Sequence, residues 1–439
     1  MQSAFLGLID RPATSGLNPR FVKEALNVDW RGGVASRRLG VRRVNNTALS
    51  GTIRQGVYFA RFHSGTTERL AAHGASISVV TREPTAITNS LPSDWAALTG
   101  GSPTYFQKLN DLIFISNGID NDTKYNGTVR QKWGISAPGS APTITEAAGS
   151  VSSVRRYVAT FVNSATGHEG PPSSQTEEKT LDNENGTVVS PSAPTDPQVD
   201  QWRAYAAIVV GGRPGIFYRI GTANIGTNLT DNFSDANLKI RNILEEFVND
   251  TPAGPFSLIA QHGGRILAVA ASDKSIVYVS DHGGFFSKPE SFPLLSYLPI
   301  NYRGGDEITA IVSFDEYWLA FMKYSIWAVL GNWPDISMKA ISYRPDNTSI
   351  GTIDQRAVVA FEREVIFPSH DGIYALAKGE GLSEGLFTTN KLSGIIDDFY
   401  SAIDLNQLMH ASYDRSRRQY RLWCSFRTGQ DVHAQVVTS

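Results

Sequence analysis

The chain has 439 residues, of which 41% are hydrophobic and 19% are charged, and its formal net charge is −2. This apolar content is enough for a packed core and excludes a largely disordered chain. The near-neutral charge gives no overall basic signature for nucleic-acid binding. The single cysteine, Cys424, excludes an intrachain disulfide and is typical of a protein made in a reducing cytoplasm.

The N-terminal region predicts an extended arm followed by a hairpin. Residues 1–20 are rich in Gly, Pro and Asn, and this arm is either disordered or packed on a neighbouring subunit. It lacks a basic start and a long apolar run, so we expect no signal peptide. Residues 24–44 contain two β segments around Gly32-Gly33, which predicts a β-hairpin.

Six later segments repeat one pattern, an apolar strand, a tight polar turn and a second apolar strand. The turns follow Phe62, Leu109, His262, Phe314, Phe361 and Tyr413, and these positions are separated by 47, 153, 52, 47 and 52 residues. The third-strand aromatic residues Tyr278, Trp327 and Tyr374 share this spacing, at 49 and 47 residues. A period of about 40–50 residues built of strands is typical of a β-propeller.

The one long interval leaves room for about 100 inserted residues beyond a normal repeat. The insertion, residues 137–250, opens with a Pro-rich linker and contains short strands near 154–162, 187–189, 202–207 and 217–221. Short strands with Pro-rich turns in a segment of this size predict a small fibronectin-like β-sandwich. A weak helical pattern lies near its exit, from Leu238 to Phe247.

These patterns together predict an all-β protein, a six-bladed β-propeller with an inserted fibronectin-like β-sandwich domain. Its parts are residues 1–136 (arm, hairpin and first blades), 137–250 (inserted domain) and 251–439 (remaining blades). A short helix is expected at 395–403. The last hairpin lies close to the C-terminus, so the N-terminal hairpin is expected to complete the last blade. A β-sandwich or two stacked barrels are the alternative architectures.

No constellation of residues predicts catalysis, a cofactor or a metal ion. The histidines are scattered and no Gly-x-Ser-x-Gly or P-loop pattern occurs. The segments Ser280–Phe285 and Ser369–Tyr374 resemble the Asp-box turns of sialidase-like propellers, in which the aspartate caps a turn. A glycosidase would need a carboxylate pair, or a tyrosine nucleophile with an arginine cluster, and the sequence does not demand either.

Two basic clusters are the candidate contact residues. They are Arg37, Arg38, Arg42 and Arg43 in the N-terminal hairpin, and Arg415, Arg417, Arg418 and Arg421 at the last turn. If the two ends of the chain meet, the clusters become neighbours. They either form a solvated rim paired with carboxylates, or contact a phosphate backbone or an acidic partner surface.

Several segments, taken in order, resemble bacteriophage tail propeller proteins. The opening hairpin Asn27–Gly40 has the pattern of Asn-Val, a Gly-rich turn and Arg-x-x-Gly. The run Tyr157–Asn163 followed by Glu169–Ser173 is similar to the start of their inserted sandwich. The runs Ile308–Ile311 to Ser325–Val329 and Ser369–Tyr374 are similar to later blades.

This resemblance implies a non-enzymatic virion protein, the hub or nozzle of a short-tailed phage, made in the host bacterial cytoplasm. Such proteins form a ring of six copies below the portal and adaptor (connector), and bind a needle, plug or tail fibres below. The ring continues the channel for double-stranded DNA, which passes without sequence-specific contact and is delivered to the host. No cofactor is implied. The alternative function is that of a propeller-type glycan-active protein, a glycosidase or a receptor-binding lectin. A third possibility is a head-decoration or tail-wall protein, which would show a different symmetry in the particle.

Overall fold

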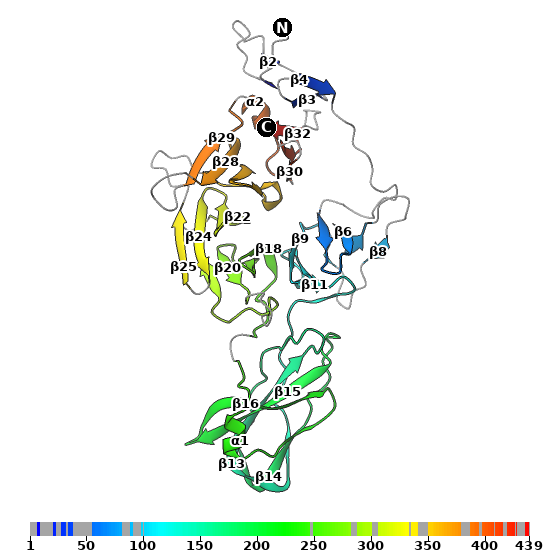
Figure 1. Cartoon of the computed structure of the whole chain (residues 1–439), viewed down its shortest axis with the longest axis vertical. Coiled ribbons are helices and arrows are strands. Elements are labelled where there is room, and N and C mark those ends of the chain that lie inside the picture. The colour runs from blue at the N-terminus through cyan, green and yellow to red at the C-terminus, as the bar shows by residue number, and fades with distance from the viewer. Residues whose placement is uncertain are drawn as a thin grey trace. The chain divides into compact units, whose positions relative to one another are not determined.

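The computed structural model describes residues 55–80, 98–99, 101–245, 249–281, 288–300, 306–331, 350–378, 387–394, 397–407, 409–415, 419–425 and 427. Of residues 7–8, 21–22, 28–31, 34–37, 88–90, 332, 335–340, 398–399 and 435–438 it describes the backbone alone. The chain divides into two compact units, one of residues 1–48, 81–87 and 299–439 and one of residues 49–80 and 88–298. The regular secondary structure of the described residues is nearly all strand, so the fold is all-β (Figure 1).

The second unit contains three small sheets, here named I to III, in which strands that follow one another in sequence are hydrogen-bonded neighbours. Sheet I consists of β5 (Gly56–Arg61), β6 (Thr67–His73), β7 (Ser76–Val79) and β8 (Thr88–Ser90). Sheet II consists of β9 (Tyr105–Leu109), β10 (Leu112–Ser116), β11 (Thr123–Tyr125) and β12 (Arg130–Lys132). Sheet III consists of β18 (Phe256–His262), β19 (Arg265–Ala270), β20 (Ile276–Val279) and β21 (Tyr297–Pro299).

The first unit contains three further sheets, IV to VI, of the same kind. Sheet IV consists of β22 (Ile308–Phe314), β23 (Tyr317–Met322), β24 (Ile326–Asn332) and β25 (Asp335–Ala340). Sheet V consists of β26 (Val359–Phe361), β27 (Glu364–Pro368), β28 (Ile373–Lys378) and β29 (Phe387–Lys391), preceded by the 3-10 turn η1 (Gln355–Ala357). Sheet VI consists of β30 (His410–Asp414), β31 (Gln419–Trp423) and β32 (Gln435–Thr438).

Each of the six predicted hairpins forms the first two strands of one of these sheets, so the repeat read from the sequence is a repeat of sheets. The turns explain why the hairpins were recognisable. Asn110 and Asp111 both have positive φ, as do Gly263 and Gly264, and two such residues give the tight turn whose twist matches the flanking strands. The short helix α2 (Asp397–Ser401) lies where a helix was expected.

Successive sheets within a unit share hydrophobic cores. Sheets I and II pack around side chains such as Leu70 and Ile113. Sheets II and III share an aromatic group in which Trp133 lies between Phe114, Phe256 and Phe292. In the other unit, one cluster joins sheets IV and V, and a second joins sheets V and VI. Strands buried on both faces account for the nearly continuous apolar runs in the sequence.

The N-terminal hairpin is confirmed, but it does not complete sheet VI. β3 (Val28–Arg31) pairs with β4 (Val34–Arg37) in a separate two-stranded sheet. The third strand of sheet VI is β32, which comes from the C-terminal residues. Of the predicted arm, β1 (Gly7–Leu8) pairs in parallel with β2 (Phe21–Val22), and the rest of residues 1–20 lies outside the described residues.

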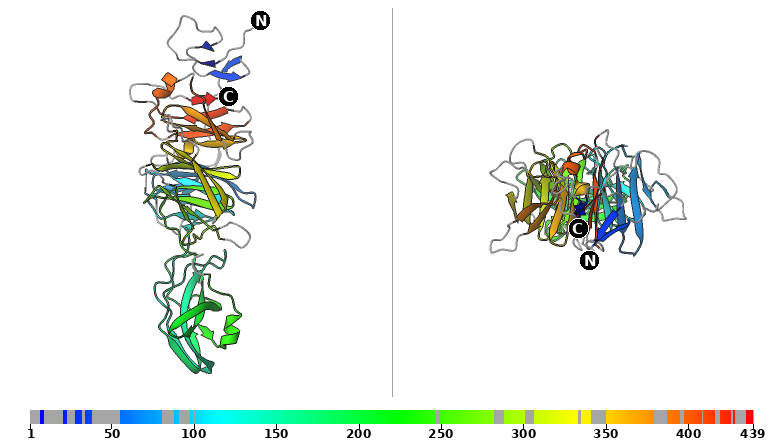
Figure 2. Two further views of the ribbon diagram at one scale, coloured as in Figure 1. Left: turned by 90° about the vertical axis from the view of Figure 1, so that its left-hand side faces the viewer. Right: turned by 90° about the horizontal axis from the view of Figure 1, so that it is seen from above.

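The inserted segment forms a five-stranded sheet in the order β16-β15-β13-β14-β17. Its strands are β13 (Ile144–Val162), β14 (Lys179–Val188), β15 (Gln201–Val210), β16 (Arg213–Asn224) and β17 (Leu229–Asp231), followed by helix α1 (Asp235–Lys239). Figure 2 shows this sheet curling, with α1 at its side. The weak helical pattern therefore yields only the five-residue α1, after which Ile243 forms a bridge to Tyr218 at the edge of β16.

One long strand explains why the insertion differs from the expected fibronectin-like sandwich. β13 pairs with β14 along its first half and with β15 along its second half, after a register irregularity near Val151. The sheet is therefore continuous where a sandwich would have two sheets. Its concave side encloses a core around Tyr157, Phe161 and Trp202, to which α1 contributes Leu238.

Candidate functional site

Most of the predicted basic residues lie outside the part of the chain that the structure describes. Arg37 ends β4, where only the backbone is described, and Arg415 is exposed after β30. Arg38, Arg42, Arg43, Arg417 and Arg418 lie outside the described residues. Arg421 pairs with Asp414 at 2.8 Å in a partly buried ion pair. That the two clusters are neighbours stays a prediction.

A connected group of polar side chains surrounds Glu169, on the face of the inserted sheet that is opposite its core. Strand β15 alternates between the faces, so Trp202 and Ala204 enter the core while Arg203 and Tyr205 point the other way. Glu169 is only 5% exposed. Its carboxylate accepts hydrogen bonds from the Tyr205 hydroxyl (2.6 Å) and the Thr160 hydroxyl (2.5 Å), and pairs with the Arg203 guanidinium.

A second buried ionic group connects this part of the insertion with sheets II and III. Lys124, on β11, forms an ion pair with Glu290, which precedes β21, and both side chains are less than 5% exposed. His168 is 2% exposed, its Nδ1 atom has no hydrogen-bond partner, and its charge interacts with both residues. Burial, reinforced by the positive charge of Lys124, lowers the pKa of His168 to about 4, so the imidazole is neutral at pH 7.

We call the group of Lys124, Glu290, His168, Lys288 and Glu169 the ionic junction. Opposite charges largely compensate one another within it. Burial alone would raise the pKa of Glu290, but Lys124 and His168 outweigh it and the pKa is lowered. Burial lowers the pKa of Lys288, while Glu169 opposes that shift. Desolvated charges cost free energy unless they are paired. Lys124 and Glu290 pair between sheets II and III, and His168 and Glu169 of the insertion interact electrostatically with the charges of this group.

A hollow of about 230 Å³ lies beside this junction. It is lined by the charged residues Glu169, Arg203, Arg219, Glu245, Asp281 and Lys288, and by Tyr205, Asn242, Ile243 and Asn249. Burial and the neighbouring Glu169 carboxylate raise the pKa of Tyr205, so its hydroxyl stays protonated and donates to Glu169. A tyrosine in this state is a structural donor and a poor nucleophile.

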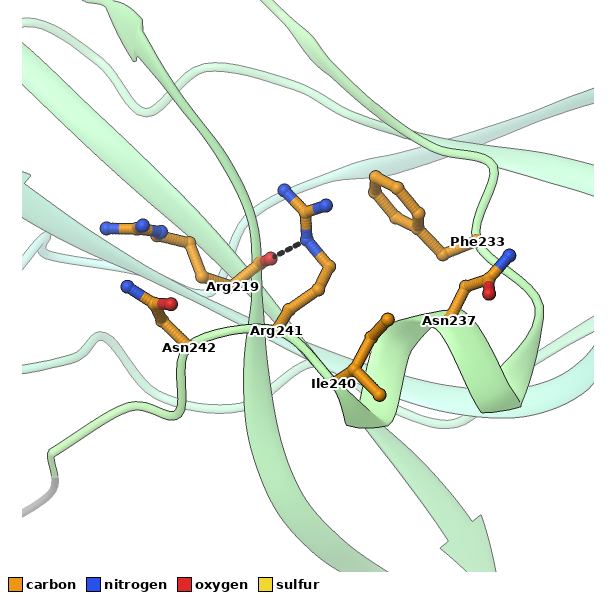
Figure 3. A pocket seen from close by; sticks show the side chains of 6 residues that line it. All are labelled: Arg219, Phe233, Asn237, Ile240, Arg241 and Asn242. Carbon is orange, nitrogen blue, oxygen red and sulfur yellow. Dashed lines mark hydrogen bonds between the residues drawn. The ribbon is translucent and has the colours of Figure 1, made fainter.

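A second hollow, of about 440 Å³, adjoins the first and shares Arg219 and Asn242 with it. Its other lining residues are Phe233, Asn237, Ile240 and Arg241 (Figure 3). The guanidinium of Arg241 donates from Nε to the Arg219 carbonyl (2.6 Å) and from Nη2 to the Ile220 carbonyl (2.9 Å). The same group lies 4.1 Å from the centre of the Phe233 ring.

Sequence reasoning missed both the junction and the hollows. In the sequence of β15, Arg203 and Tyr205 alternate with the core residues Trp202 and Ala204. This alternation was the sequence signal that the face opposite the core carries polar groups. Among the described residues, no group of three or more His, Cys, Asp or Glu side chains could hold a metal ion, and no helix is long and apolar enough to cross a membrane. Burial raises the pKa of the Cys424 thiol to about 11, so this thiol is protonated at neutral pH.

Comparisons with known proteins give no family for the chain. No protein-family model matches it, and no curated protein does. Among solved structures, apo AztD from Citrobacter koseri is similar with a TM-score of 0.32 and 11% identity, over 84% of this chain and 80% of that one. The AfRom2 CNH domain is similar with a TM-score of 0.27 and 9% identity, over 86% of this chain and 92% of that one. At these TM-scores neither likeness carries an argument about fold or function.

Proposed function

We propose that the six small sheets are the blades of one β-propeller and that the protein is a structural component of a phage tail, a hub or nozzle. In this proposal, copies form a ring that continues the DNA channel below the portal and adaptor and anchors distal tail parts. The observation that carries it is the order of modules. A hairpin, two sheets, one inserted domain and four more sheets follow one another along this chain. The tail propeller proteins that the sequence resembles also have an entry hairpin and an inserted domain, although in this chain the inserted domain is a single sheet.

The free faces of the first and last sheets support a closed propeller. In sheet I, Val57 and Phe59 are exposed on one face. In sheet VI, Trp423 is exposed and its ring centre lies 6.0 Å from that of His410. In the proposed propeller the first and last sheets would be neighbours, and packing them together would remove these exposed aromatic and apolar side chains from water.

The buried ionic junction supports a mechanical role. Lys124 and Glu290 pair with each other, and Glu169 is held by Tyr205, Thr160 and Arg203, so these charges already have protein partners. A firm connection between an inserted module and its parent sheets suits a part that must hold its shape while DNA passes. We therefore expect the protein to act without catalysis, cofactor or sequence-specific DNA contact.

The test is the assembly state of the purified full-length protein. Mass photometry should detect a ring-sized oligomer, and electron-microscopy class averages should show sixfold symmetry, either alone or on phage particles from the same genome. A protein that stays monomeric, and that antibodies do not locate on the tail of such particles, would contradict the proposal.

One observation favours the alternative, a propeller-type glycan-active protein. Tyr205, Glu169 and Arg203 form the tyrosine, carboxylate and arginine combination that some glycosidases use, beside a polar hollow. The Glu169 carboxylate is nearly buried and already accepts three partners, which is why we rank this function second. Turnover of fluorogenic glycosides by the wild type and its loss in Tyr205→Phe would reverse the ranking.

A further inference from the structure

We propose that the hollow beside helix α1 is a docking site for a protein segment that carries both a carboxylate and an apolar side chain. The hollow lies on the inserted sheet, between β16 and the segment that follows α1. The inference concerns this surface alone and does not require the protein to belong to a phage tail.

The first step is that Arg241 is held in place before any ligand arrives. Its guanidinium is fixed by two backbone carbonyls on β16 and lies over the Phe233 ring. These contacts occupy Nε and Nη2 and leave Nη1 available at the hollow. A cation that is already ordered loses little conformational freedom on binding, which favours recognition of an anion.

The second step is that Arg219 adds a positive charge without a described partner. Its side chain lines both hollows, and among the described residues it forms no hydrogen bond or ion pair. Figure 3 shows Arg219 and Arg241 on neighbouring segments, with Asn242 beside Arg219. The described residues that line the 440 Å³ hollow include two arginines and no carboxylate, so the complementary ligand is an anion.

The third step distinguishes a protein segment from nucleic acid. Ile240 is 83% exposed and lies at the hollow, and Ile243, also exposed, lines the adjoining one. Exposed isoleucine side chains gain from contact with apolar side chains and gain little from a phosphate backbone. Together with the two arginines they favour a segment in which an acidic residue lies close to an apolar one.

The experiment selects random dodecapeptides on the immobilised full-length protein and measures the binding of the enriched peptides by fluorescence anisotropy. We expect enrichment of peptides that combine Asp or Glu with Leu, Ile, Val or Phe. Arg219→Gln and Ile240→Ser should each weaken binding about tenfold, the size of one lost charge-assisted or apolar anchor. Both side chains are at the surface, so circular dichroism should show unchanged folding.

Matched controls lie on the same sheet outside the hollow. Arg213→Gln on β16 and Val210→Ser on β15 remove an exposed arginine and a 76% exposed apolar residue, and both should leave binding unchanged. Three results would overturn the inference: enrichment of peptides without acidic residues, equal binding by Arg219→Gln, or stronger binding of a double-stranded DNA 20-mer than of any peptide. Loss of self-association in Ile240→Ser, with no peptide enriched, would also overturn it and assign the surface to a second copy of the chain.

Discussion

Asp122 is the individual residue whose protonation state matters most for the sheets around it. It is buried between sheets II and III, where its Oδ1 atom accepts a hydrogen bond from the Phe256 amide at 3.3 Å and its Oδ2 atom has no partner. Burial raises its pKa from 3.8 to about 7. In the unfolded chain this carboxyl ionises near pH 4, so the folded protein binds the proton more tightly than the unfolded protein does.

This difference predicts how Asp122→Asn changes stability with pH. The carboxyl contributes stability that is fully present below pH 4 and is lost as the pH rises to about 7. The amide does not titrate, so the two proteins should be similarly stable near pH 4. At pH 8 the variant should be more stable by an amount on the order of 3 kcal/mol. Urea unfolding from pH 4 to 8 measures this, and a stability difference that does not vary with pH would refute it.

At the residue scale, the sequence identified classes of side chain but not the contacts they make. Arg37 and Arg415 were recognisable as parts of basic clusters because they lie near other arginines in the sequence. Lys124 and Glu290 are separated by 166 residues, and no local pattern connects them. A buried ion pair formed by distant segments is created by tertiary packing, so it could not be predicted from spacing alone.

At the scale of elements, the ion pair between Lys124 and Glu290 is a buried link between sheets II and III. Glu290→Gln would leave the buried Lys124 ammonium without its counter-charge, and we expect a loss of about 3–5 kcal/mol in the free energy of unfolding. The double variant Lys124→Met with Glu290→Leu removes both charges and should recover most of that loss. Denaturant unfolding of the wild type, both single variants and the double variant gives the interaction free energy between the two side chains.

A surface ion pair provides the control for this prediction. Lys323 and Glu307 lie 3.2 Å apart, each 44% exposed, so Glu307→Gln should cost no more than about 1 kcal/mol. If Glu290→Gln is no more destabilising than Glu307→Gln, the buried pair does not hold the sheets together. If the double variant is as unstable as Glu290→Gln, the loss comes from packing rather than from an unpaired charge.

Elements formed by local contacts were predicted well, and elements completed by distant residues were not. The hairpins follow from apolar runs around short turns, of two residues in four of the six, which is information within about 15 residues of sequence. β13 was recognised only in its second half, because its first half contains the small residues Ala147 to Ser150 beside a register irregularity. β32 was not predicted because the segment between Trp423 and Gln435 separates it from its partner β31.

At the scale of the whole molecule, the inserted sheet is the part most able to fold alone. Its core contains only residues between Ile135 and Leu238, and its strands pair only with one another. We therefore predict that a fragment of residues 135–250 unfolds cooperatively on heating and gives a dispersed NMR spectrum. Trp202→Ala removes the largest side chain of that core, and the same fragment with this change should lose its cooperative transition.

The fragment also shows whether the properties of His168 depend on contact between the inserted sheet and sheets II and III. His168 is the one histidine between residues 135 and 250, so its imidazole signals are unambiguous. In the full chain the neutral imidazole contributes stability that is present above pH 6.5 and is lost as the pH falls towards 4. Burial is the largest cause of the lowered pKa, so if sheets II and III supply that burial, the pKa of His168 in the fragment should return towards about 6.5. If the pKa of His168 stays near 4 in the fragment, residues of the insertion alone bury this side chain. The ionic junction then does not join the inserted sheet to sheets II and III.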